Sequence, residues 1–143
     1  MKINIIAVGS LTKEYQSLYN SYIKKISFFA QINLIEIKEV ASDNINLKIE
    51  KETKLILDKI PKNSKVIYLS IKGNQMTSEN FSEILVENNL TFIIGGSNGV
   101  NENYFDKKIS FSQMTFPHQL FRILLVEQIY RGLSIQKNIK YHK

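Results

Sequence analysis

Short apolar runs rich in β-branched residues recur along the chain, separated by stretches in which apolar residues come every three or four positions. A continuous apolar run bounded by turn residues is typical of a buried strand. The clearest examples are KINIIAV, which stops at Gly9, and LTFIIGG, which runs into a glycine turn. The pattern predicts five strands, at residues 2–8, 32–38, 64–71, 90–96 and 109–112.

The stretches between these runs have the spacing of helices. After the first strand, one helical face is formed by Leu11, Tyr15, Leu18, Tyr22, Ile26 and Phe29. Pro61 is expected to end a second helix, and Thr77 is a suitable N-cap for a third. We predict these helices over residues 11–29, 47–60 and 77–86, a short helix over 101–108 and a long one over 117–136.

Strands and helices therefore alternate along the chain. Alternation requires crossover connections, which place helices on the faces of a parallel sheet. At 143 residues the chain has the length of one domain with its own core. The predicted fold is α/β, with a mostly parallel sheet, helices on both faces and a single domain over residues 1–143.

The last predicted helix is apolar around nearly its whole circumference. Nine of the residues between 120 and 133 are apolar. A helix that packs only on its own sheet needs one apolar stripe, so the remaining surface needs another cover. We predict a two-fold homodimer with this helix in the interface; the alternative is a helix buried within one chain.

Composition narrows the kinds of chemistry available. The chain has no cysteine and two histidines far apart in sequence, which excludes disulfides and disfavours a metal site. No apolar run has the roughly 20 residues of a membrane span, and the first residues lack a signal-peptide cleavage site. We expect a cytoplasmic protein without a metal.

The net charge of +6 is concentrated at one end of the chain. Residues 1–106 have as many acidic as basic side chains, whereas residues 107–143 have seven basic side chains and one acidic one. A local basic surface favours a polyanion such as nucleic acid. The alternative is a basic face that is only solvated.

Three strand ends are candidates for a ligand site, because ligands of parallel α/β sheets bind beyond the carboxyl ends of strands. They are LSIKG, GGSNG and SQMTFPH, at residues 69–73, 95–99 and 112–118. Each has a structural alternative: a tight turn at the glycines, a helix start at Pro117, and an exposed early-helix position for His118. Arg122 follows His118 by four residues, which pairs two donors on one helical face. Glu127 and Arg131 have the same spacing and predict a structural ion pair.

The tail KNIKYHK, residues 137–143, allows two interpretations. Chain ends are usually frayed. A basic tail with Tyr141 and His142 is also suited to stack on a base and to meet phosphates.

Taken together and in this order, several segments resemble the SPOUT-superfamily RNA methyltransferases, within them the ribosomal RNA large subunit methyltransferase H group. The segments are MKINIIAVGSL, YLSIKG, FIIGGSNGV, SFSQMTFPHQLFRILLVEQIYRGLSI and the final YHK. The resemblance covers essentially the whole chain. It implies a trefoil-knotted α/β fold at the C-terminal part, a homodimer and S-adenosyl-L-methionine as methyl donor. The implied target is N3 of a pseudouridine in 23S large-subunit ribosomal RNA within the assembled ribosome.

The resemblance also implies roles for individual residues. The donor site would be lined by Leu69, Gly95, Gly96, Gln113, Met114, Thr115, Phe116, Pro117 and His118. The target nucleotide would be faced by His118, Arg122, Tyr141, His142 and Lys143, with the tail reaching the partner subunit's pocket. We hypothesise that His118 or His142 takes the N3 proton or polarises a carbonyl, and that Arg122 and Lys143 stabilise charge.

Two other functions remain open on the residues alone. One is an RNA binder of the same fold without activity, which would bind RNA but not the donor. The other is a flavodoxin-like nucleotide-binding enzyme, which is disfavoured because no phosphate loop or acidic metal cluster accompanies the strand ends.

Overall fold

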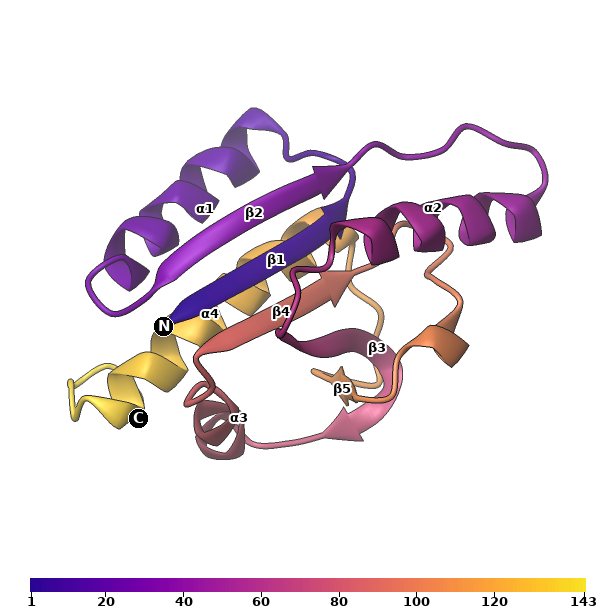
Figure 1. Ribbon diagram of the computed structural model, residues 1–143. Helices are drawn as coiled ribbons and strands as arrows, with labels where there is room; N and C mark the ends of the chain where they lie inside the picture. The colour runs from indigo at the N-terminus through magenta and orange to yellow at the C-terminus, as the bar shows by residue number, and fades with distance from the viewer.

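Five parallel strands form one sheet in the order β2-β1-β4-β3-β5, as the computed structural model of residues 1–143 shows (Figure 1). The elements alternate along the chain as predicted. They are β1 (Lys2–Val8), α1 (Lys13–Ile26), β2 (Gln31–Ile37), α2 (Ile45–Lys59), β3 (Lys65–Gln75), α3 (Ser78–Ile84), β4 (Asn89–Ile94), the 3-10 turn η1 (Glu102–Tyr104), β5 (Lys108–Ser110) and α4 (His118–Gln136).

Two elements differ from the prediction by more than three residues at a boundary or in their kind. β3 continues to Gln75, four residues beyond the predicted end, because a register shift between Leu69 and Asn74 lets it pair twice with β5. A Cβ on Gly73 would lie 2.6 Å from the backbone of β5, so only glycine allows this approach. The segment predicted as a short helix over 101–108 forms only the turn η1.

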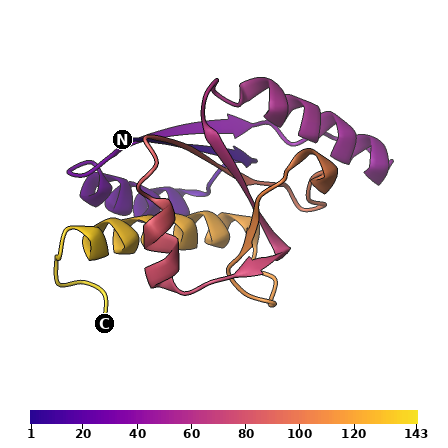
Figure 2. The same ribbon diagram turned by 60° about the horizontal axis from the view of Figure 1, so that its bottom comes forward.

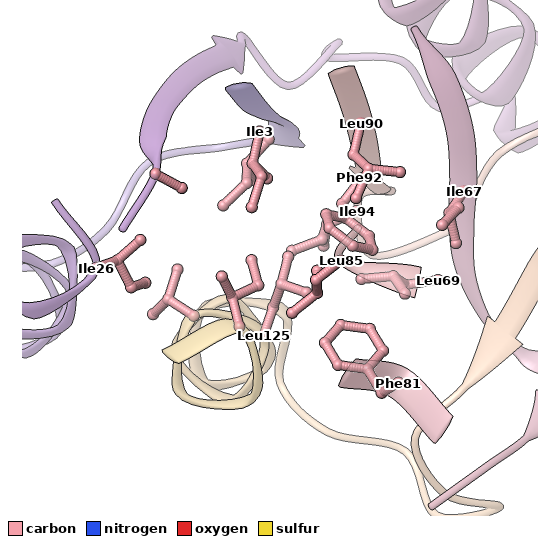
Figure 3. Packing of buried hydrophobic residues seen from close by; sticks show 14 of the residues in the cluster. Ile3, Ile26, Ile67, Leu69, Phe81, Leu85, Leu90, Phe92, Ile94 and Leu125 are labelled. Carbon is pink, nitrogen blue, oxygen red and sulfur yellow. The ribbon is translucent and has the colours of Figure 1, made fainter. Parts of the chain in front are cut away.

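The helices cover both faces of the sheet, which confirms the predicted fold class (Figure 2). α1, α3 and α4 lie on one face and α2 lies on the other. Alternate β1 side chains divide accordingly: Ile3 and Ile5 join the core under α4, whereas Ile6 joins the core under α2. Figure 3 shows side chains of the larger core meeting between the sheet, α3 and Leu125 of α4.

The packing around α4 bears on the predicted dimer, which was inferred from the apolar circumference of this helix. α1 and α3 flank this helix on the same face of the sheet, and none of its large apolar side chains is exposed. Close packing on α3 uses Gly132, where a Cβ would lie 2.6 Å from Leu85 and 3.2 Å from Ser82. The apolar circumference of α4 is thus largely covered within one chain, which is the alternative that the sequence left open.

None of the helices is both long and apolar enough to cross a membrane. The side chains also form no group of three or more histidine, cysteine or carboxylate residues arranged to hold a metal ion.

Candidate functional site

A cleft of about 360 Å³ lies where the middle of β3, beside its register shift, and the carboxyl end of β4 meet the loop before α4. This is the edge of the sheet at which parallel α/β folds bind ligands, and the volume lies in the range of small-molecule sites. Seven of the residues expected to bind a donor line it together: Leu69, Gly95, Gly96, Met114, Thr115, Phe116 and His118. The other two, Gln113 and Pro117, belong to the same loop but are not among the lining residues.

Glycine is required at the turn that follows β4. The Gly99 N–H donates to the Gly96 carbonyl over 3.0 Å, and Gly99 has a left-handed φ of 76°. A Cβ on Gly95 would lie 3.2 Å from Gly99, and a Cβ on Gly96 would lie 3.1 Å from Val8. The close turn therefore presents bare backbone to the cleft.

Side chains of α2 hold this turn from the opposite side. Lys48 Nζ donates to Asn98 Oδ1 over 3.0 Å and pairs with Glu39 over 2.8 Å. The Asn101 N–H donates to the Thr53 hydroxyl over 3.0 Å. The hydrogen bond from Lys48 lowers the pKa of Glu39, and the same bond raises the pKa of Lys48. The contacts of Lys48 with Asn98 and of Thr53 with Asn101 could not be predicted from the sequence, because they join residues about 50 positions apart.

Two further residues of the cleft wall lie outside the expected set. Glu102 Oε1 accepts from the Ser70 hydroxyl over 2.9 Å and lies 4.0 Å from Lys108. Tyr68 stacks on Phe105 with 5.3 Å between ring centroids. Burial, aided by the charge of Glu102, raises the pKa of Tyr68 to about 12. Tyr68 thus keeps its proton at neutral pH.

The raised pKa of Tyr68 makes stability depend on pH in the alkaline range. A folded-state pKa above the unfolded value of about 10 contributes stability that is fully present below pH 10. That contribution will be lost as the pH rises from about 10 to 12. The free energy of unfolding, measured with urea across this pH range, should fall less steeply with pH in Tyr68→Phe than in the wild type. Equal slopes would contradict the assignment.

His118 and Arg122 do not lie together in the cleft. His118 lines it, with Nε2 3.8 Å from the position of a Cβ on Gly9. The Arg122 side chain is only 1% exposed, and it pairs with Glu36 over 2.5 Å and donates to the Gly9 carbonyl over 3.1 Å. Within this chain Arg122 anchors the first turns of α4 to the ends of β1 and β2. Its contact with the target nucleotide stays a prediction.

The C-terminal tail packs on its own chain. The Tyr141 hydroxyl donates to Glu127 over 2.6 Å, and the Arg131 guanidinium lies over the Tyr141 ring. His142 contacts Glu79 of α3 and lies 3.1 Å from Arg131. Glu127 and Arg131 also form the predicted ion pair, at 2.8 Å.

The tail follows the end of α4 that lies away from the cleft. α4 begins at the cleft with His118 and ends before the tail, and its 19 residues span roughly 28 Å. Figure 1 shows the arrowheads of β1, β2 and β4 at the upper right and the C-terminus at the lower left. Within one chain, Tyr141, His142 and Lys143 therefore do not meet the residues that line the cleft.

The comparison with known protein families finds a match over nearly the whole chain. The family model described as "Predicted SPOUT methyltransferase" matches residues 1–142. The chain belongs to the SPOUT methyltransferase family. A Bacillus anthracis protein of known crystal structure has the same fold as this SPOUT protein, with a TM-score of 0.59, 12% identity and 99% of each chain covered.

Several relatives of this SPOUT methyltransferase are named "Ribosomal RNA large subunit methyltransferase H". The protein of Metamycoplasma arthritidis is 71% identical over 143 residues, and that of Mycoplasma mobile is 68% identical, with 100% of both chains covered in each case. The protein of Mesomycoplasma hyopneumoniae is 46% identical, covering 99% of this chain and 98% of the relative.

Proposed function

We propose that this protein transfers a methyl group from S-adenosyl-L-methionine to N3 of a pseudouridine in 23S ribosomal RNA, on the assembled ribosome in the cytoplasm. The observation that carries the proposal is the cleft between β3, the carboxyl end of β4 and the loop before α4 in a SPOUT methyltransferase. Relatives that match the whole chain are named for large-subunit ribosomal RNA. The excess of basic side chains in residues 107–143 suits a phosphate-rich partner.

The residues of the cleft fit a nucleoside-type donor. The bare backbone at Gly95 and Gly96 allows close approach of a polar ligand, while Leu69 and Phe116 supply apolar walls. Met114 and Thr115 complete one wall, and Gln113 and Pro117 shape the loop that carries them. S-adenosyl-L-methionine, when bound, supplies an electrophilic methyl group on a sulfonium.

The remaining task of the protein is to orient the acceptor and remove its proton. Holding the two reactants in line can supply a large part of the rate acceleration. N3 of the base carries a proton that has to leave, so a nearby base is needed at neutral pH. His118 lies in the cleft, and His142 lies in the tail beside Tyr141 and Lys143. Arg122 acts indirectly, by holding the first turns of α4 and with them His118.

The separation of tail and cleft supports a homodimer. A tail that packs on the second half of α4 and on α3, away from its own cleft, can serve catalysis only at the cleft of another subunit. In a two-fold dimer each subunit would give its tail to the partner. Each active site would then combine the cleft of one chain with Tyr141, His142 and Lys143 of the other.

Titration calorimetry with S-adenosyl-L-methionine tests the donor site. The wild type should release or absorb measurable heat, and Gly96→Val should bind about 10-fold to 100-fold more weakly because the turn must shift against Val8 and Glu52. Val86→Ser, at an exposed position outside the cleft, should bind as the wild type does.

The target is tested separately by methylation assays on intact ribosomes, free subunits and naked ribosomal RNA. Incorporation confined to ribosomes, at a single pseudouridine, is the expected result. A wild-type protein that binds RNA but gives no calorimetric response to the donor would instead be a non-catalytic RNA binder.

A further inference from the structure

A buried carboxylate lies directly behind the glycine turn of the cleft. Glu52, on α2, is completely buried. Its Oε2 accepts from the Val40 N–H over 2.9 Å, whereas its Oε1 has no hydrogen-bond partner. A buried carboxylate oxygen without a partner is costly and rare in native proteins. This one therefore calls for a functional explanation.

The unpartnered oxygen faces the donor cleft across a single residue. Glu52 Oε1 lies 3.0 Å from the position that a Cβ on Gly96 would occupy. Gly96 itself lines the cleft and has no side chain. Only the backbone of this glycine thus lies between the Oε1 atom and the cleft.

The other acidic groups around the cleft are paired with cations. Glu102 lies 3.8 Å from Lys72 and 4.0 Å from Lys108. Glu39 pairs with Lys48, whose Nζ also bonds to Asn98. Lys48 is one helical turn from Glu52, and its pKa is raised mainly by the hydrogen bond to Glu39 and less by the charge of Glu52. Its ammonium group pairs with Glu39 and forms no ion pair with Glu52. Glu52 is therefore the carboxylate that remains free to act on a ligand.

We propose that Glu52 makes the cleft prefer a cationic sulfonium over a neutral thioether, an inference that rests on the proposed function. A sulfonium donor carries a permanent positive charge, which is lost with the methyl group. A fixed carboxylate behind Gly96 attracts the donor and has no such attraction for S-adenosylhomocysteine. Glu52 is thus a specificity-determining residue that favours exchange of the spent product for fresh donor.

The test compares the dissociation constants of the donor and of S-adenosylhomocysteine by titration calorimetry. Glu52→Gln keeps the shape and the acceptor for the Val40 N–H but removes the charge. It should weaken donor binding about tenfold, as one unit charge does over several ångströms in a protein, and change the affinity for S-adenosylhomocysteine less than about twofold. A merely structural role would weaken both ligands equally, and that outcome would overturn the proposal.

Glu50→Gln is the matched control. It removes the same charge from the same helix, at an exposed carboxylate that accepts from the Asn101 side chain over 2.8 Å. It should leave the ratio of the two dissociation constants unchanged. A ratio that falls as much in this variant as in Glu52→Gln would show a general charge effect and overturn the specific role.

Glu52→Asp keeps the proposal testable if Glu52→Gln does not fold. Aspartate retains the charge but places it one methylene farther from Gly96. The preference for the donor over S-adenosylhomocysteine, given by the ratio of the two dissociation constants, should therefore be weaker than in Glu50→Gln but stronger than in a cleft without this charge. A ratio equal to that of the wild type would then overturn the proposal. A wild type that binds neither ligand would refute the proposed donor function itself, which is a different result.

Discussion

Deletion of Tyr141, His142 and Lys143 is expected to reduce methylation of ribosomes at least about 100-fold, because proton transfer and charge stabilisation commonly contribute that much. Donor binding should stay within about twofold of the wild type, since the tail lies at the far end of α4 from its own cleft. Calorimetry and single-turnover methylation measure the two effects separately. Loss of both together would place the tail in donor binding.

Dimers mixed from two variants show whether the tail acts at the cleft of its own chain or at the cleft of the partner. Chains with Gly96→Val keep a normal tail, and chains without the last three residues keep a normal cleft. If each site combines two chains, remixing equal amounts after denaturation should restore about a quarter of the wild-type sites, because half of the dimers are mixed and each has one complete site. Activity that stays at the level of the separate variants would instead assign tail and cleft to the same chain.

Loss of Glu36 is expected to give the largest fall in stability. The Arg122 guanidinium is 1% exposed, so Glu36→Ala leaves a buried cation with only the Gly9 carbonyl as partner. Removing one member of a buried ion pair costs about 3–5 kcal/mol in the free energy of unfolding. Urea denaturation should show this as a lower midpoint with an unchanged slope.

Two controls replace the other member of this ion pair and one member of an exposed ion pair. Arg122→Met should cost less than Glu36→Ala, because the Glu36 carboxylate is 37% exposed and can be hydrated by water. Glu87→Ala removes the partner of Lys65 in a pair that is about half exposed on both sides, and it should change stability by less than about 0.5 kcal/mol. Equal losses for Glu36→Ala and Glu87→Ala would contradict the structural role given to Arg122.

The order of elements and the position of the cleft were predictable from the sequence. Apolar runs such as KINIIAV and the regular spacing of apolar residues between them reflect local backbone geometry, which has periods that can be counted. Parallel strands all place their carboxyl ends at one edge, so the predicted strand end near Leu69 and the turn after β4 had to converge there.

Only the tertiary structure determined which partners the charged side chains contact. The helical spacing predicted that Arg122 lies beside His118. In the structure the Arg122 guanidinium pairs with Glu36, because a buried cation needs a carboxylate partner. The spacing along the helix does not reveal that partner. The unpartnered oxygen of Glu52 behind Gly96 and the distance between tail and cleft depend on contacts between residues far apart in the chain. Periodicity specifies which face of an element is buried, whereas the partner across that face is set by how the whole sheet and its helices pack.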